Sequence, residues 1–329
     1  MTTMLMKDVL PHWEPRTPVG HRSLTLVPLQ AAEQQERYQN YLLAFEAIDA
    51  GLLTVTEVSE SGSVPELLAV NDADRPVLLI DGEELQGAKQ NRIMNTSVLL
   101  APKSKTPIPV SCVEEGRWSH TSRAFKSGNY SASSLRQRKS RDVQESLRSR
   151  GRAESDQGAV WQSVAEQLDA CKAAAPTRAM CDAMTTRGEA VERYQEALPY
   201  PSGACGVVAA ICGRFVAMDA FDSPTTLEVI WHRLVASYAM DAESAVDAPN
   251  KPFSAKAVEV LLEHVAAQQC QAFAAVGLGH DLRFSASNML GQGLEVDRHL
   301  LHMSAFPSAE QRQHGHMGPR IQPPSARNR

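Results

Sequence analysis

A succession of short apolar runs, separated by turn-forming residues, limits the fold of this chain more than any other feature. Residues 52–58 (LLTVTEV) alternate apolar and polar side chains, as a half-buried strand does. Two further runs, 66–72 and 76–81, flank a turn-like stretch from Asp72 to Pro76. Short strands with tight turns predict an antiparallel sheet or sandwich in the first 120 residues. The other strands predicted there are 23–29, 94–102 and 106–113.

Helical spacing takes over in the middle of the chain. Apolar side chains recur at this spacing between Val160 and Cys171, and Asp156 is a candidate N-cap. A second helix is predicted over 177–197. Asp222, Ser223 and Pro224 supply a cap and a first-turn proline for a third helix, and Ser254 opens a fourth.

Strands return in two later regions. Residues 203–221 predict a buried hairpin that turns near Gly213 and Arg214, and residues 271–306 predict a strand meander with glycine-bearing turns. The expected fold class is therefore α+β, with an antiparallel strand-rich N-terminal half, a helical middle and a C-terminal strand meander. Whether the two sets of strands join one sheet is left open.

The expected organisation is a single large domain over residues 21–306. Residues 1–20 are expected to form an extended arm, and the polar tail 307–329 is expected to be disordered. Within the domain, the Ser/Arg-rich segment 119–155 has two interpretations. It is either a solvated, partly disordered connector or a basic segment that closes over an anion. Leu135, Val143 and Leu147 could give it one helical face.

Composition excludes several classes of function. The 329 residues carry a formal net charge of −5 and only 5% aromatic side chains, so no nucleic-acid partner is expected. No apolar run is long enough for a transmembrane helix, and the first residues do not resemble a signal peptide. The six cysteines are dispersed without a CxxC pair, which favours a reduced, cytoplasmic location.

The stretch LIDGEELQGAKQNR (79–92) is the strongest candidate site. Asp81 follows a predicted strand, and ligands gather where side chains leave a sheet edge. Lys89 and Arg92 could clamp a phosphate or carboxylate, while amides could bind hydroxyls. A salt-bridged loop is the alternative, and a metal site is disfavoured without a nearby His or EF-hand spacing. The candidate ligand-binding residues, expected to share one concavity, are Lys89, Gln90, Asn91, Arg92, Asn95 and Arg117.

A second stretch, SCVEEGRW (111–118), contains a cysteine at a predicted strand end. A reactive thiolate needs a cationic or His neighbour, and Arg117 and His120 are close in sequence. Strand alternation nevertheless places Cys112 on the apolar face, which favours a buried structural thiol. Glu114 and Arg117 are spaced to form an ion pair.

His299 and His302 form an HxxH pattern near the end of the predicted meander. In a strand, residues three apart point to opposite faces, so a shared metal ion is not expected.

Several longer motifs resemble one family: DGEELQGAKQNRIMNTSVLL, KTPIPVSCVEEGRW, FDSP, SYAMDA and HMSAF. The chain is similar, from about residue 20 to 306, to the ADP-ribosylglycohydrolase- and rhodanese-phosphatase-associated protein domain, a bacterial family named from genomic association. The resemblance implies a soluble protein linked to ADP-ribose or nucleotide metabolism. It brings no established catalytic residues, cofactor or oligomeric state.

Three functional hypotheses follow. The first is a module that binds a small anionic, ADP-ribose-like or nucleotide ligand through the polar site at 81–117. The second is a hydrolase acting on such a ligand, for which Asp81, Glu83 and Glu114 are the candidate catalytic carboxylates. The third is a scaffold protein without a small-molecule site.

Overall fold

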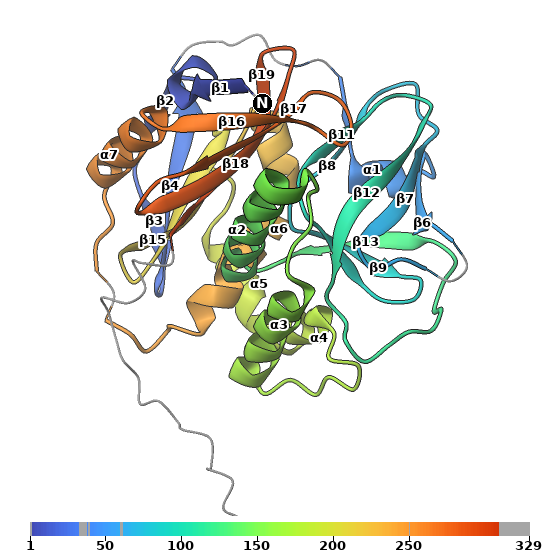
Figure 1. Cartoon of the computed structure of the whole chain (residues 1–329). Helices are drawn as coiled ribbons and strands as arrows, with labels where there is room; N and C mark the ends of the chain where they lie inside the picture. Colours follow the sequence, from blue (N-terminus) through green and yellow to red (C-terminus); the bar gives the residue numbers. More distant parts are fainter. Residues whose placement is uncertain (1, 33–37, 39, 60–61, 250, 309–329) are drawn as a thin grey trace, which may run out of the picture.

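Strands from both ends of the chain meet in one ten-stranded antiparallel sheet (Figure 1). The computed structural model describes residues 2–32, 38, 40–59, 62–249 and 251–308. In spatial order, the sheet contains β1 (Thr2–Leu5), β16 (Gln269–Ala274), β17 (His280–Ser285), β18 (Met289–Val296), β19 (His299–Pro307), β15 (Arg214–Phe221), β14 (Gly206–Ile211), β4 (Leu24–Ala31) and β2 (Trp13–Pro15), with β3 (Val19–His21) also on β4.

The N-terminal segment belongs to this sheet and does not form the extended arm expected for residues 1–20. Strand β1 pairs with β16, with Thr2 opposite Ala272, and β2 and β3 both pair with β4. Met6 and Trp13 are buried in the core on one face of the sheet. Burial of these two large side chains, together with strand pairing, holds the segment against the rest of the chain.

Residues 42–130 form a separate, smaller β unit. Of the strands in the N-terminal half, only β1 to β4 therefore share a sheet with the C-terminal meander. One sheet of this unit has six antiparallel strands and the other has three, with β5 and β8 parallel. The first contains β13 (Phe125–Tyr130), β9 (Glu83–Gly87), β10 (Arg92–Met94), β12 (Ser104–Cys112), β7 (Glu66–Asn71) and β6 (Leu53–Glu57). The second contains β11 (Val98–Leu100), β8 (Val77–Leu79) and β5 (Leu42–Leu43), and α1 (Ala44–Asp49) packs beside it.

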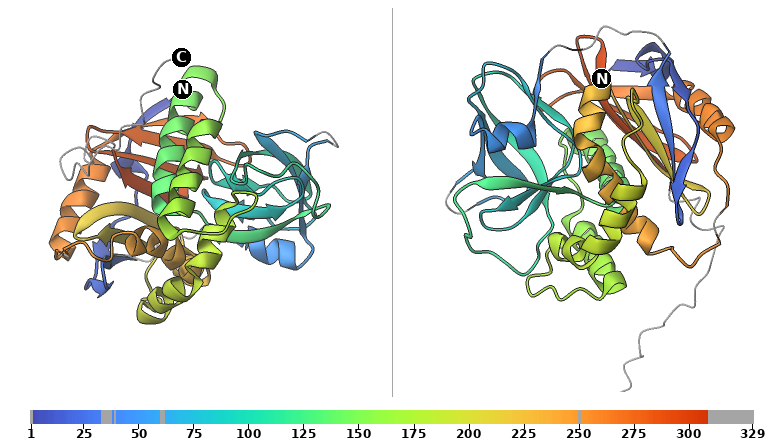
Figure 2. Two further views of the ribbon diagram at one scale, coloured as in Figure 1. Left: turned by 90° about the horizontal axis from the view of Figure 1, so that it is seen from below. Right: turned by 180° about the vertical axis from the view of Figure 1, so that it is seen from behind.

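The Ser/Arg-rich segment forms α2 (Ser133–Arg150), which lies between the large sheet and the smaller β unit (Figures 1 and 2). This part of the segment is an ordered helix with one buried face, and not a solvated, disordered connector. Leu135 and Val143 have no exposed surface, and Leu147 is also buried. The three residues predicted as a possible helical face are thus the buried apolar side chains of α2.

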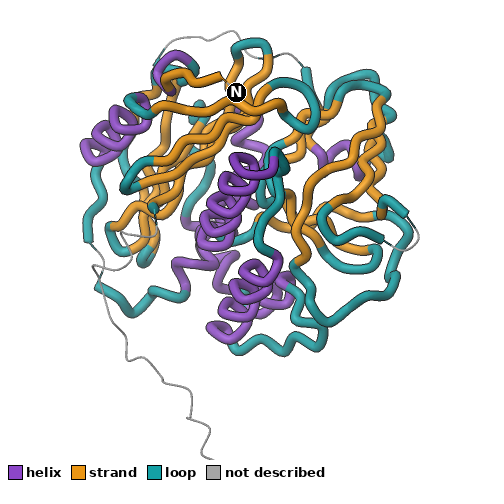
Figure 3. Tube along the Cα trace, viewed as in Figure 1, coloured by secondary structure: helices purple, strands orange, loops and turns teal. Residues whose placement is uncertain are grey.

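The remaining helices are α3 (Gln157–Cys171), α4 (Met180–Thr186), α5 (Gly188–Ala197), α6 (Pro224–Glu243) and α7 (Ala255–Ala266), shown with the strands in Figure 3. The three predicted caps are confirmed. The side chains of Asp156, Ser223 and Ser254 each accept a hydrogen bond from a backbone N–H in the first turn of their helix. The helix predicted over 177–197 is instead two helices, which meet at Arg187 and Gly188.

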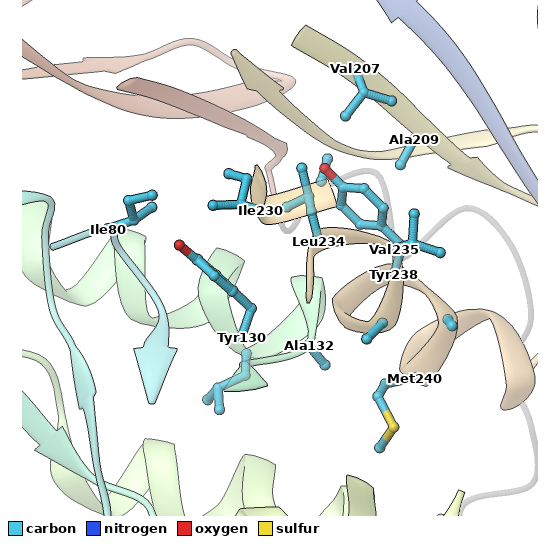
Figure 4. Packing of buried hydrophobic residues seen from close by; sticks show 14 of the residues in the cluster. Ile80, Tyr130, Ala132, Val207, Ala209, Ile230, Leu234, Val235, Tyr238 and Met240 are labelled. Atoms are coloured by element: carbon cyan, nitrogen blue, oxygen red, sulfur yellow. The ribbon is translucent and has the colours of Figure 1, made fainter. Parts of the chain in front are cut away.

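The predicted α+β fold class, with its hairpin and C-terminal meander, is confirmed. Strand alternation divides the core between the two faces of the large sheet. On β19, Met303 and Ala305 face the core next to α7, while Phe306 faces α2 and α6. Figure 4 shows part of the core on the α2 and α6 side of the sheet, where Leu234 and Tyr238 of α6 lie near Val207 of β14. Residues 309–329 of the expected disordered tail lie outside the described residues.

Replacing Leu135 by Ala tests whether α2 is a core element. Removal of a fully buried leucine side chain is expected to lower the free energy of unfolding by about 2–5 kcal/mol. Glu145→Ala, at an exposed position on the same helix, should change it by about 0.5 kcal/mol or less. Urea unfolding of both variants measures the difference, and equal stabilities would contradict the packing described here.

Candidate functional site

The candidate site residues from the sequence fall into two groups in the structure. Asp81, Glu83 and Asn95 lie on the side of the smaller β unit that faces α2 and α6. Lys89, Gln90, Asn91, Arg92, Glu114 and Arg117 lie around the loop that follows β12. The nine residues are buried or nearly so, and the expected single concavity is replaced by these two environments.

Two cations on one face of α2, Lys139 and Arg136, lie beside the first group. The Lys139 ammonium donates to Asp81 Oδ1 and lies 3.2 Å from the Asn95 carbonyl oxygen, and neither charged side chain has exposed surface. One turn earlier, Arg136 makes a two-point contact with Asp219 of β15, at 2.7 and 3.0 Å. We call Asp81, Arg136, Lys139, Asp219 and His302 the buried ionic network.

Asp219 receives two further hydrogen bonds. Tyr238 Oη donates to its Oδ2 at 2.6 Å, and Ser304 Oγ donates to its Oδ1 at 2.7 Å. Burial alone would raise the pKa of Asp219, but the Arg136 guanidinium and the His302 side chain hold it well below its usual range. Asp219 is therefore a carboxylate at every physiological pH.

His302 links the two ion pairs. Its Nδ1 lies 2.7 Å from Ser97 Oγ, and Ser97 Oγ accepts a hydrogen bond from the Asp81 backbone N–H at 2.9 Å. On the other side of the ring, Nε2 lies 3.2 Å from Ser304 Oγ, and Phe221 stacks on the imidazole. The imidazole therefore bridges the two ion pairs through the hydroxyl groups of Ser97 and Ser304.

Gly82 is required beside this network. Its φ is +80°, and a Cβ at this position would lie 2.5 Å from Arg136 Cδ. The glycine in the DGEEL motif therefore lets the backbone approach the buried arginine.

Glu83 and Asn95 also have protein partners. Glu83 accepts hydrogen bonds from the Ile80 backbone and from Ser127 Oγ, and burial raises its pKa. The Asn95 side chain donates to the Ala153 carbonyl oxygen and accepts from Ser111 Oγ. Asp81, Glu83 and Asn95 thus tie the smaller β unit to its neighbours.

In the second group, Glu114 and Arg117 form the expected ion pair. Arg117 Nε and Nη2 lie 2.8 and 2.5 Å from the two Glu114 carboxylate oxygens, and Nη1 donates to the Ala88 carbonyl oxygen. Asn91 N–H and Gln90 Nε2 donate to the side chain and backbone of Glu114. Burial raises the pKa of Glu114, but the hydrogen bonds from Arg117 and Asn91 outweigh it and lower the pKa. This Glu114–Arg117 cluster holds the loop in place.

Cys112 is buried, as the strand alternation predicts. Its Sγ donates to Gln90 Oε1 at 3.1 Å and to the Glu114 carbonyl oxygen at 3.3 Å. Burial raises the pKa of the thiol despite the nearby Arg92 guanidinium. Cys112 is therefore a protonated thiol at neutral pH, which disfavours the nucleophile hypothesis.

Arg92 is less completely paired. Its Nη1 donates to the backbone and side chain of Gln90, and Nη2 lies 3.9 Å from Glu57 Oε1. Among the described residues, Nε and Nη2 have no hydrogen-bond acceptor, although the side chain has no exposed surface. Its guanidinium carbon lies 5.7 Å from the centre of the Trp118 ring, and Lys89 Nζ lies 5.3 Å from it.

Trp118 is 48% exposed, so part of this indole is open to solvent. We call Glu57, Lys89, Arg92 and Trp118 the Trp118 surface. Lys89 and Arg92 belong to the predicted 81–117 region, and Glu57 and Trp118 add the neighbouring carboxylate and an accessible aromatic ring. Trp118 directly follows the candidate residue Arg117, so its position in the sequence could have suggested a place in the site. No local pattern showed that its ring contacts Lys89.

Glu84 was not among the candidates, although it lies in the opening motif. Burial raises its pKa to about 7. Its Oε2 accepts hydrogen bonds from Gln86 Nε2 and Asn129 N–H, while Oε1 has no hydrogen-bond partner among the described residues. A buried carboxyl of this kind changes its charge near neutral pH.

Where the structure describes the chain, no three His, Cys, Asp or Glu side chains are grouped so that they could hold a metal ion. His302 is buried in the ionic network, whereas His299 bonds to the Asp297 carbonyl oxygen. None of the described helices combines the length and apolarity needed to cross a membrane.

Breaking the buried ionic network should be costly. Lys139→Met leaves the Asp81 carboxylate buried without its cation, which is expected to lower the free energy of unfolding by about 3–5 kcal/mol. The double variant Asp81→Asn, Lys139→Met removes both charges and should recover much of this loss. Urea unfolding of the two variants provides the comparison, and a double variant less stable than Lys139→Met would refute the pairing.

Glu84 should make stability depend on pH. Because its folded-state pKa of about 7 exceeds the ordinary value of 4.5, its contribution is fully present below pH 4.5. The contribution is lost as pH rises to about 7. Glu84→Gln should therefore gain stability relative to the natural chain between pH 5 and pH 8 in urea unfolding. Parallel stability profiles for the two proteins would be the contrary result.

A protein-family comparison agrees with the motifs. The model of the ARG and Rhodanese-Phosphatase-superfamily-associated Protein domain matches residues 12–306, which is most of the chain. No curated protein and no solved structure matches the chain. With the match covering both sheets and the helices between them, the chain belongs to the family of the ARG and Rhodanese-Phosphatase-superfamily-associated Protein domain.

Proposed function

We propose that this protein binds an ADP-ribose-like or nucleotide ligand at the Trp118 surface. The family name supports this ligand class, since it associates the domain with ADP-ribosylglycohydrolases. The proposal narrows the site expected at 81–117 to two cations of that region, Lys89 and Arg92, together with the neighbouring Trp118, whose ring both cations contact.

The observation that carries the proposal is the pairing of Arg92 with Trp118. Two buried nitrogen atoms of the Arg92 guanidinium lack acceptors within the described part of the chain, which costs free energy unless a water molecule or ligand supplies an oxygen. Directly beside them, the indole of Trp118 is half exposed. The surface therefore offers cationic donors and an aromatic plane within one ligand length.

A nucleotide has groups that match both features. A purine base can stack on the exposed part of Trp118, since stacking on an aromatic side chain contributes about 1–3 kcal/mol per base. A phosphate oxygen can accept hydrogen bonds from Arg92, while Lys89 adds positive charge beside the ring. Arg117 does not join them, because Glu114 and three carbonyl oxygens occupy its guanidinium.

Binding is supported better than hydrolysis. Asp81 and Glu83 are inside the protein, and Glu114 is in an ion pair with Arg117. A general base has to reach the reacting water or hydroxyl. None of these three carboxylates faces the open part of the Trp118 surface through a described contact.

Trp118→Ala tests the proposal. AMP, ADP-ribose or NAD should raise the melting temperature of the natural chain. The Trp118→Ala variant should bind the same nucleotide with an affinity at least about tenfold lower. Without ligand, its stability should change by about 1 kcal/mol or less, because the ring is half exposed. Thermal shift and isothermal titration calorimetry measure the two effects.

The matched control is Val260→Ala, at a 56% exposed position on α7. It should leave both stability and affinity unchanged. The proposal fails if none of the three nucleotides shifts the melting temperature of the natural chain, or if Trp118→Ala and Val260→Ala bind equally well.

A further inference from the structure

We propose that a cleft between α2, α3 and α6 is a second binding site, which takes a small oxyanion such as the phosphate or pyrophosphate group of a metabolite. The cleft has a volume of about 380 Å³, within the range of small-molecule sites. None of its lining residues belongs to the Trp118 surface, so the inference is independent of the proposed function.

Three arginines line this arginine cleft: Arg138 and Arg141 from α2, and Arg187 from the junction of α4 and α5. Like charges in one small volume repel each other, and an anion between them relieves that repulsion. Arginine also suits the ligand, because its planar guanidinium makes two parallel hydrogen bonds to a phosphate.

Two of the arginines are held in position by the protein. Arg138 donates to Ser163 Oγ and Gln162 Oε1 on α3, both at 3.1 Å. Arg187 Nη1 donates to the Met240 carbonyl oxygen of α6 and to Oγ of Ser244, the C-cap of that helix. Each guanidinium has five N–H donors, so these bonds fix the group and leave donors for a ligand.

Arg141 differs from the other two arginines. It is exposed, and its side chain extends from α2 into the lining of the same cleft. An exposed cation beside two hydrogen-bonded ones can contact an anion that enters the cleft. The sequence interpretation of a basic segment that closes over an anion corresponds to this position on α2.

The cleft also contains two carboxylates, Glu166 and Asp241, and both have protein donors. Asp241 accepts hydrogen bonds from Ser134 N–H at 2.8 Å and from the hydroxyl groups of Ser133 and Ser134, which fixes the start of α2. Glu166 accepts from Gln162 Nε2 at 3.0 Å. Three arginines thus line the cleft with two carboxylates that already accept hydrogen bonds, while Asp142, outside the lining, interacts electrostatically with Arg141 and Arg138.

Charge reversal at Arg141 tests the site. Isothermal titration calorimetry of the full chain with inorganic phosphate and with pyrophosphate, at low ionic strength, should show binding, with pyrophosphate tighter. Arg141→Glu should weaken pyrophosphate binding about tenfold or more, because it replaces a charged donor with a repelling carboxylate. Its melting temperature without ligand should stay close to that of the natural chain, since Arg141 is exposed.

The matched control is Arg193→Glu, an exposed arginine on α5 outside the cleft, which makes the same change in net charge. It should bind pyrophosphate as the natural chain does. Equal loss in both variants would mean that only overall charge matters, and no binding of either anion would also overturn the proposal.

A third variant separates the two sites. Trp118→Ala should leave pyrophosphate binding unchanged, because pyrophosphate has no base to stack on the indole. If Trp118→Ala loses AMP binding while Arg141→Glu keeps pyrophosphate binding, the Trp118 surface is supported and the arginine cleft is refuted.

Discussion

Two cations on one face of α2 are almost completely buried, and each is paired with a carboxylate from a different sheet. Lys139 pairs with Asp81, which follows β8 in the smaller β unit, and Arg136 pairs with Asp219 on β15 of the large sheet. A buried charge without its partner costs several kcal/mol, so both pairs have to form when the core closes. These pairs therefore fix the position of α2 relative to both sheets. They also explain how a segment rich in Ser and Arg becomes a central helix.

The family motifs describe the surroundings of this helix. Phe221 of FDSP stacks on His302 of HMSAF, and Tyr238 of SYAMDA donates to Asp219. Asp241, in the same SYAMDA motif, accepts from the first turn of α2. The opening motif contributes Asp81 and the close approach of Gly82 to Arg136. Motifs far apart in the chain thus converge on one interior, and much of their polarity is used to hold the fold together.

Groups suited to ligands remain outside that interior. At the Trp118 surface, an indole and two cations lie together at the edge of the Glu114–Arg117 cluster. In the arginine cleft, guanidinium groups are positioned by α3 and α6. In both places neighbouring hydrogen bonds fix the charged groups before any ligand arrives, which lowers the entropy cost of binding.

The sequence by itself determined the elements whose signals are local. Asp156, Ser223 and Ser254 cap their helices because a side chain and the N–H group it accepts lie within three residues. The hairpin around Gly213 and the C-terminal meander follow from alternation and turn residues. The burial of Cys112 followed in the same way from strand alternation.

Only the tertiary structure decided which charges meet. Asp81 and Lys139 are separated by 58 positions and Arg136 and Asp219 by 83, so no local pattern links them. For the same reason the sequence could not show that strands within residues 2–31 pair with later strands. Nor could it show that Asp81 and Asn95 contact α2, whereas Arg92 lies beside Trp118. A charged side chain has the same local pattern whether it stays in water or is buried with a partner. The choice depends on the partner that the rest of the fold brings to it.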